Sequence, residues 1–267
     1  MKKFLKFIFW LTVFAIFSAG LLYFLYSKDQ ADTLSAARPL DTLFNEVRER
    51  PDYVPGDQIP EFLKEATVSV EDARFYDHDG LDYWGLIRAA LSQFIPIFDR
   101  SGGSTITQQV VKNLYGRFEG GIAWKGSEML LALQLEKMYS KDEILTVYLN
   151  IINYGDNYTG IAQASSGYFQ CLPMNLNEAE SSLLAGIPQS PAYFALNDHF
   201  ANAKNKQKIV LESMVRNHYI SEDEADQIYA EPINYVAHGQ WMIGTACLYQ
   251  QKAFSPLSFL SISAFSL

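Results

Sequence analysis

The longest hydrophobic run of the chain lies at its amino end, where residues 7–26 contain no charged side chain. A run of this length crosses the hydrocarbon core of a bilayer as one helix. Lys2, Lys3 and Lys6 precede the run, and positive charges in this place keep the short end in the cytoplasm. The pattern therefore predicts an anchor that sends the rest of the chain outside. A cleaved signal peptide is the competing interpretation, but its apolar core is shorter, whereas aromatic residues continue here to Tyr26.

After this run, helix signals dominate and strand-like alternation is scarce. Apolar residues in 126–139 recur at helical intervals through Leu131, Leu135 and Met138. Polar caps followed three residues later by Glu predict helix starts at Ser140, Asn177 and Ser221. Gly186 and Pro188 should end the second of these helices. We predict a mostly α protein with an anchor at 1–28, one helical domain at 29–235 and a tail of unassigned role at 236–267.

Composition and charge narrow the class of protein. The chain is 49% hydrophobic and 14% aromatic, which is ample for a folded core. Its net charge of −9 argues against a nucleic-acid binder, which would carry an excess of Lys and Arg. Cys171 and Cys247 lack metal-ligand spacing, so no structural metal site is expected. We expect the two to be unpaired thiols, with a disulfide as the alternative.

One segment reverses the overall negative charge. Between residues 88 and 125, two acidic residues, Asp99 and Glu119, stand against five basic ones, namely Arg88, Arg100, Lys112, Arg117 and Lys125. This excess predicts a local anion site, and a solvated helix face explains the charges equally well.

Candidate chemistry centres on two carboxylates, Glu71 and Glu128. Making or breaking a glycosidic bond commonly uses two carboxylates in different environments, one for proton transfer and one to stabilise positive charge at the sugar carbon. Glu71 follows the apolar run TVSV, so partial burial should raise its pKa toward that of a working base. Taken alone, either residue would more often be a surface ion-pair partner.

Several segments together resemble the peptidoglycan glycosyltransferase family. In order along the chain they are EDARFYDHDGLD at 71–82, GGSTITQQVVKN at 102–113, KGSE at 125–128, ILTVYLN at 144–150 and EAESSLLAGIPQSP at 178–191. One such block could arise by chance, whereas five in order are specific. The resemblance implies a lysozyme-like helical domain that polymerises lipid II into glycan strands at the outer face of a bacterial inner membrane.

The resemblance also implies roles for individual residues. Glu71 would be the general base and Glu128 the second catalytic carboxylate. The lipid pyrophosphate would leave with inversion at the sugar carbon. Residues expected to bind substrate are Asp72, Ser104, Thr105, Gln108, Gln109, Lys112, Arg117, Lys125 and Asn150.

Some of these residues also have a structural interpretation. Gly102 and Gly103 with Ser104 and Thr105 could be a turn and a helix cap, and Asp72 is expected to orient its neighbours. His78 is expected to be a structural hydrogen-bonding residue and not a base, and Phe75 fits a core position equally well.

The third block departs from the family pattern. Trp124 stands where the family usually has Arg, and Gly126 and Ser127 stand where a second basic residue is sometimes found. Expected phosphate contacts are therefore missing. A weakly active or inactive scaffold in cell-wall assembly is one alternative that follows, and a lytic, lysozyme-like enzyme is another.

Further expectations concern the membrane, metals and partners. Residues 91–100 are apolar and aromatic, which predicts either a flap that dips into the bilayer or ordinary core packing. No tightly bound cofactor or protein metal site is expected, and Mg or Mn would accompany the substrate pyrophosphate. No Ser-x-x-Lys occurs, so no transpeptidase is expected. Lipid II, the growing glycan, the bilayer and other cell-wall synthesis proteins are the expected partners.

Overall fold

The structure, a computed structural model, describes residues 2–92, 103–116 and 121–236. Within these ranges the chain is helical, and strand-like pairing is limited to a bridge between Asn153 and Thr159. The helices are α1 Lys2–Ala37, α2 Leu40–Arg48, α3 Glu61–Glu71, α4 Tyr83–Ser92, α5 Ile106–Leu114, α6 Gly121–Met138, α7 Lys141–Ile151, α8 Ile161–Phe169, α9 Glu178–Gly186, α10 Pro191–Phe194, α11 Leu196–Arg216 and α12 Glu222–Ala230. The predicted mostly α fold behind an N-terminal apolar helix is confirmed.

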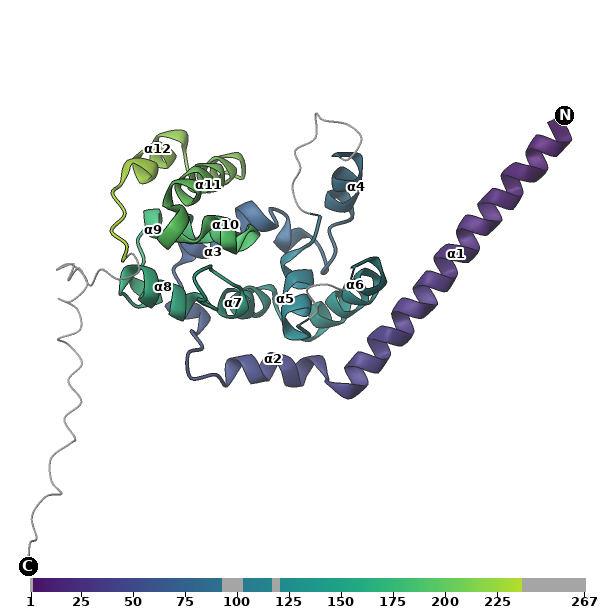
Figure 1. Cartoon of the computed structure of the whole chain (residues 1–267), viewed down its shortest axis with the longest axis horizontal. Coiled ribbons are helices and arrows are strands. Elements are labelled where there is room, and N and C mark those ends of the chain that lie inside the picture. The colour runs from purple at the N-terminus through teal and green to yellow at the C-terminus, as the bar shows by residue number, and fades with distance from the viewer. Residues whose placement is uncertain (1, 93–102, 117–120, 237–267) are drawn as a thin grey trace, which may run out of the picture.

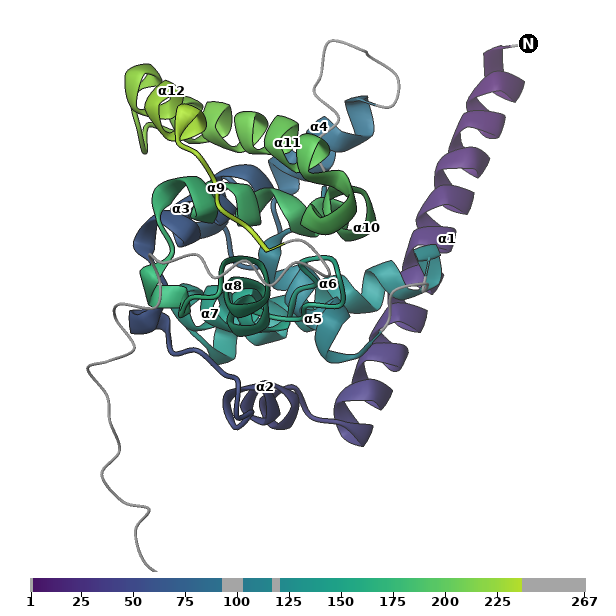
Figure 2. The ribbon, with the colours of Figure 1, turned by 60° about the vertical axis from the view of Figure 1, so that its left-hand side comes forward.

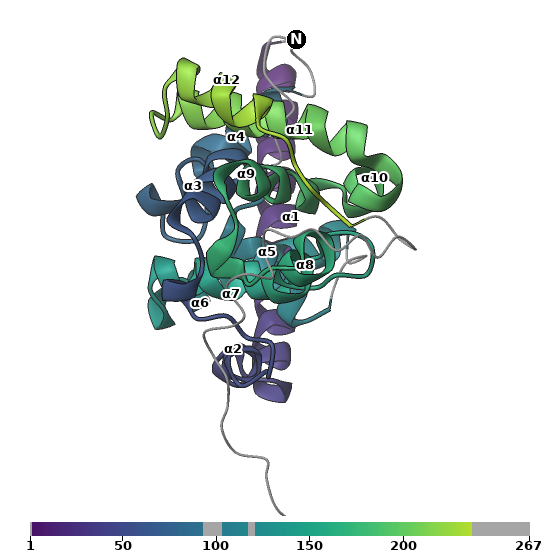
Figure 3. The ribbon, with the colours of Figure 1, turned by 90° about the vertical axis from the view of Figure 1, so that its left-hand side faces the viewer.

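The helices of the domain form two groups (Figures 1 and 2). In one group α3, α9 and α11 pack against one another, and in the other α5 packs on both α6 and α7. Helix α1 runs along α6, and Figure 3 shows it behind the domain. The two groups meet where Glu71, at the end of α3, and Asp72, the next residue, bond the first turn of α5. The candidate site lies at this junction.

The helix starts follow from local sequence. The capping boxes predicted at Ser140, Asn177 and Ser221 are confirmed, and each side-chain oxygen accepts a hydrogen bond from the backbone amide three residues later. Helix α9 ends at Gly186, as predicted. A further capping box, which the sequence analysis did not identify as one, opens α5 at Thr105.

Helix α1 continues beyond the predicted anchor. It is the one helix of the described chain that is long and apolar enough to cross a membrane, and this fits a single-pass anchor. Large apolar side chains are exposed along it as far as Tyr26, whereas Ser27 and Ala31 are buried. The predicted boundary after residue 28 thus falls inside an unbroken helix whose outer part belongs to the packed domain.

The loop between α3 and α4 returns toward α6 through Gly80. Its φ of +92° is a conformation that residues with a side chain rarely adopt, and a Cβ atom there would lie 3.0 Å from the carbonyl oxygen of Ala132. Phe75, in the short 3₁₀ helix Phe75–Asp77 of this loop, is fully buried in the core. The loop is therefore fixed at both places, and this positions the residues that follow Glu71.

Several predictions concern residues outside the described ranges. They include residues 93–100 of the apolar segment 91–100, which contains Arg100, together with Arg117, Cys247 and the tail from 237 onward.

Candidate active site

Glu71 is the last residue of α3 and is partly buried. Gln109 of α5 donates a hydrogen bond from Nε2 to Glu71 Oε2 at 2.8 Å. The hydroxyl of Tyr148 in α7 lies 3.4 Å from Gln109 Oε1 and can donate to it. This contact orients the amide so that its NH₂ group faces the carboxylate. Three helices thus fix the position of one carboxyl group.

The pKa of Glu71 is raised above its ordinary value, chiefly because burial disfavours the charged form. The hydrogen bond from Gln109 acts in the opposite direction, as do the positive charges of Lys206 and Lys112, while Asp72 adds to the rise. The raised pKa expected from the apolar run before Glu71 is confirmed. Its use as a general base stays a prediction.

Glu128 lies on α6 and is 4% exposed. Gln108 of α5 donates to Glu128 Oε1 at 3.1 Å, and Lys125 Nζ lies 2.5 Å from the same oxygen. Lys125 also donates to Ser104 Oγ at 2.8 Å. The structure therefore brings four of the predicted residues into one hydrogen-bonded cluster at the start of α5 and α6.

The two carboxylates are connected through the first turns of α5. Gln108 and Gln109 are consecutive, so their side chains leave the helix in different directions. One reaches Glu128 and the other reaches Glu71. Lys112, about one turn further along α5, is close enough for its charge to act on Glu71. The arrangement places amides and ammonium groups between two acidic groups in different surroundings.

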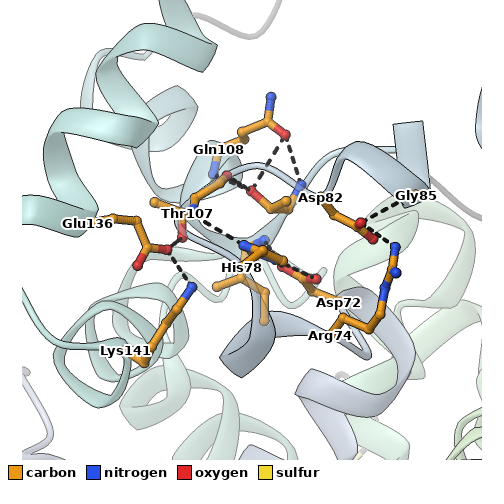
Figure 4. Close-up of polar contacts among 12 residues, drawn as sticks. Asp72, Arg74, His78, Asp82, Gly85, Thr107, Gln108, Glu136 and Lys141 are labelled. Carbon is orange, nitrogen blue, oxygen red and sulfur yellow. Dashed lines mark hydrogen bonds and ion pairs between the residues drawn. The ribbon is translucent and has the colours of Figure 1, made fainter. Parts of the chain in front are cut away.

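Asp72, the residue after Glu71, holds the start of α5 in place (Figure 4). Its carboxylate accepts a hydrogen bond from the backbone amide of Ile106 at 3.0 Å and contacts His78 Nε2 at 3.1 Å. His78 Nδ1 accepts from the backbone amide of Gly80, so Nε2 carries the proton that Asp72 accepts. Thr105 donates to the Gly80 carbonyl at 2.7 Å. These contacts are those of structural hydrogen-bonding residues.

Two ion pairs support this loop from outside (Figure 4). Asp82 accepts from Arg74 and from the backbone amide of Gly85, which fixes the first turn of α4. On the opposite side, Glu136 of α6 accepts from Thr107 at 2.5 Å and from Lys141 at 2.7 Å. Helices α4, α5, α6 and α7 are thereby linked around the loop that carries Asp72.

Several residues predicted to bind substrate form hydrogen bonds with the protein itself. Thr105 and Asp72 are buried, with their oxygen atoms bonded to the protein itself. Asn150 of α7 bonds the backbone of Val54 and Thr146, so the structure does not join it to the Glu71 and Glu128 cluster. Arg117 lies outside the described residues. A direct role of these four residues in substrate binding stays a prediction.

Lys206 of α11 is a residue that the sequence analysis missed. It is 5% exposed, and its positive charge acts on Glu71. Burial lowers its pKa, and the charge of Glu71 opposes that effect. The available signal was its position, because Ala203 and Val210, one turn before and one turn after it, are apolar. A lysine in an apolar stripe of a helix needs a buried partner, and that partner is visible only after folding.

The described part of the chain shows no metal cluster, and its cavity lies apart from the two carboxylates. It contains no group of three or more His, Cys, Asp and Glu side chains that could hold a metal ion. A surface cavity beside α2 is lined by Arg38, Arg50 and Asn113 among others, and neither Glu71 nor Glu128 lines it. The candidate site is therefore defined by its hydrogen-bonded groups and not by that cavity.

Comparison with known proteins gives consistent matches. Residues 37–215 match the family described as "Transglycosylase". The monofunctional glycosyltransferase of Staphylococcus haemolyticus is 34% identical over 236 residues, which cover 86% of this chain and 83% of that protein. Penicillin-binding protein 2D of Bacillus subtilis is 40% identical over 183 residues, which cover 68% of this chain and 26% of that protein. Penicillin-binding protein 1A from Haemophilus influenzae aligns structurally with a TM-score of 0.42 at 20% identity, covering 69% of this chain and 18% of that one.

The family match and the monofunctional relative define the class of the protein. The chain spans about a quarter of the length of its penicillin-binding relative from Bacillus subtilis but most of the monofunctional relative. The family match includes the helices that carry Glu71, Gln108, Gln109 and Glu128. The chain belongs to the transglycosylase family.

Proposed function

We propose that this protein is a peptidoglycan glycosyltransferase that polymerises lipid II into glycan strands and releases undecaprenyl pyrophosphate. The observation that carries the proposal is the placement of Glu71 and Glu128 on either side of Gln108 and Gln109, with Lys112 and Lys125 beside them. Membership of the transglycosylase family and the name of the monofunctional relative support the same reaction class.

In the proposed reaction, Glu71 acts as the general base. It takes the proton from the 4-hydroxyl of the acceptor sugar while that oxygen attacks the anomeric carbon of the donor. The bond from this carbon to the phosphate oxygen breaks, and its electron pair leaves with the pyrophosphate, so the carbon is inverted. A raised pKa makes Glu71 a stronger base than an exposed carboxylate, and the hydrogen bond from Gln109 keeps it oriented.

Lys125 and Lys112 are the proposed partners of the leaving diphosphate. Negative charge grows on the leaving group in the transition state, and each fixed cation directed at it is worth about 2–4 kcal/mol. Lys125 is held by Glu128 and Ser104, so Glu128 serves in this proposal to position the ammonium group as well as to balance charge. If Mg or Mn takes part, it would bind the diphosphate itself.

The proposed location is the outer face of a bacterial inner membrane. Helix α1 would span the bilayer with Lys2, Lys3 and Lys6 on the cytoplasmic side, and the domain would meet lipid II at the opposite surface. Other cell-wall synthesis proteins are expected to bind the same domain.

The test is polymerisation of purified lipid II by the full chain in detergent. Glu71→Gln should slow glycan synthesis by about 10²–10⁴-fold, the contribution of a general base. Glu212→Gln, which changes an exposed carboxylate of α11, should leave the rate unchanged. Retained synthesis by the Glu71 variant would disprove the mechanism.

The alternatives give different results in the same assay. A lytic enzyme would shorten preformed glycan without polymerising lipid II, and a scaffold would leave both substrates unchanged. Running the reaction with Mg, with Mn and with a chelator measures the proposed cation requirement.

A further inference from the structure

The outer part of α1 makes a close and specific contact with α6. Ser27 and Ala31 are each 1% exposed, although Tyr26 and the large apolar residues before it are exposed. On the side of α1 that meets α6, full burial begins at Ser27, directly after the apolar run, whereas Lys28 and Asp29 on other sides are exposed. The helix therefore has an outward-facing membrane part and a docked part without an intervening linker.

The docked part rests on Gly126 and Ser127. Ser127 Oγ bonds the carbonyl oxygen of Ser27 at 3.0 Å and Gln30 Oε1 at 2.6 Å. The hydroxyl of Tyr23 donates to the carbonyl oxygen of Ile122 at 2.6 Å, at the start of α6. These bonds attach one face of α1 to the first half of α6.

Gly126 permits the close approach of the two helices. A Cβ atom at this position would lie 2.1 Å from Ser27 Oγ and 2.8 Å from Ser27 Cβ, which is shorter than any normal contact. Small residues at a helix crossing let two backbones come together. Any side chain at position 126 would prevent this contact unless Ser27 moved.

Trp124, the remaining departure from the family pattern in this segment, lies on α6 near its contact with α1. Trp124 is 5% exposed, and its ring packs edge-on against Tyr115 with ring centroids 6.1 Å apart. The Tyr115 hydroxyl bonds the carbonyl oxygen of Arg38, just after α1. The departures at positions 124, 126 and 127 thus form contacts at or near the α1–α6 joint.

Lys125 and Glu128 lie within the same turn of α6 as this contact. We propose that Ser27, Gln30, Gly126 and Ser127, here called the anchor seat, are positioning residues that hold Lys125 and Glu128 at the membrane surface. Ser27 follows the last residue of the apolar run directly, so the seat lies where hydrocarbon gives way to water. A diphosphate that joins a sugar to a membrane lipid lies at this same boundary. The inference rests on the proposed function for its catalytic consequence.

Three variants test the seat by creating and relieving a clash. Gly126→Ala should lower kcat for lipid II polymerisation by about tenfold with KM changed less than about twofold, because misplacing catalytic groups by an ångström is costly. Adding Ser27→Gly removes the two nearest opposing atoms, Oγ and Cβ of Ser27, and leaves the Tyr23 hydroxyl at 3.0 Å. The double variant should return kcat to within about threefold of wild type. Gly20→Ala is the matched control, since no atom lies within 4 Å of a Cβ placed there.

The result that overturns the inference is wild-type turnover by the Gly126→Ala variant. Failure of Ser27→Gly to restore turnover, with thermal unfolding unchanged between the single and double variants, also overturns it. If Gly126→Ala fails to fold and adding Ser27→Gly restores folding, the contact is supported. Disulfide cross-linking then tests the contact in a folded protein.

A cross-linking experiment tests the seat without any assay of activity. In the full chain with Cys171 and Cys247 changed to Ser, the pair Gln30→Cys and Ser127→Cys should form a disulfide under mild oxidation. The control pair Gly20→Cys and Ser127→Cys should not, because residues 20 and 30 are about 15 Å apart along the helix. Absence of the first cross-link overturns the seat. Formation of the cross-link, together with a wild-type chain that fails to polymerise lipid II, would disprove the proposed function and leave the docked anchor standing.

Discussion

Glu71 and Lys206 interact electrostatically within the domain, and the pKa of each is shifted from its ordinary value. Burial raises the pKa of the acid and lowers the pKa of the lysine, while their mutual attraction acts in the opposite direction on each. For Glu71 the effect of burial is larger than the effect of the cations and of Gln109, since its pKa is raised overall. The carboxylate that we propose as the general base is therefore present at a cost in stability.

This balance predicts a pH-dependent gain in stability for Glu71→Gln. An acid whose pKa is raised by folding destabilises the folded state as pH rises from its ordinary value, 4.5, through the raised value. The neutral variant lacks this loss. Its Tm should match wild type near pH 4 and exceed it by a few degrees at pH 8, measured by thermal unfolding in detergent. A wild-type protein more stable than the Glu71 variant at pH 8 would contradict the argument.

Among the elements, α5 connects the two carboxylates. Its first turn carries Gln108 and Gln109, and its start is fixed by Thr105 and by Asp72 from the preceding loop. The Gln108 side chain has two uses, because Oε1 accepts from the Thr105 amide and Nε2 donates to Glu128. The capping box of α5 is thus part of the candidate site. A change in the cap should disturb the start of α5 and the position of Gln108 beside Glu128 together.

The cap of α5 should therefore be worth more than an exposed cap. Thr105→Ala removes bonds to the Gln108 amide and the Gly80 carbonyl in a buried place, and should lower the free energy of unfolding by about 2 kcal/mol. Ser221→Ala removes the exposed cap of α12 and should lower it by about 0.5–1 kcal/mol. Thermal unfolding of both variants under one condition measures the difference. Equal losses would show that burial adds nothing to the cap.

For the molecule as a whole, both α1 and α4 carry large apolar side chains that are exposed. In Figures 1 and 2, α4 extends to the same height as the apolar part of α1. Tyr83, Trp84 and Ile87 of α4 are large and exposed, with 71% of Trp84 accessible. Aromatic residues favour the boundary between lipid and water. This helix directly precedes the segment whose apolar composition predicted a membrane flap, and its first turn is fixed by Asp82 and Arg74.

We expect Trp84 to contact lipid in the reconstituted full chain. Bromine-labelled lipids quench the fluorescence of tryptophans that they touch, so Trp84→Phe should remove a quenchable component. Trp124→Phe is the matched control, because Trp124 is buried in the domain and should contribute emission that the lipids do not quench. Identical quenching of wild type and Trp84→Phe would contradict contact between α4 and the bilayer.

Local sequence determined the features of this protein that depend on neighbouring residues. The apolar run before Tyr26, the caps at Ser140, Asn177 and Ser221 and the end of α9 at Gly186 follow from helix periodicity and backbone hydrogen bonding over a few residues. The raised pKa of Glu71 also followed from its apolar neighbours. The grouping of Glu71 with Glu128 was an expectation from ordered motifs, since local sequence does not set distances between segments.

Only the tertiary structure decided which residues far apart in the chain share an environment. It paired Gln108 with Glu128, brought Lys206 toward Glu71 and assigned Asn150 to the backbone of Val54. It also joined Ser27 to Ser127 by a hydrogen bond. Gly126 and Ser127 of α6 therefore form the contact with α1, and their small size is what that contact requires. The physical reason is that burial and electrostatic attraction depend on distance in space, and that distance is fixed only when the helices pack.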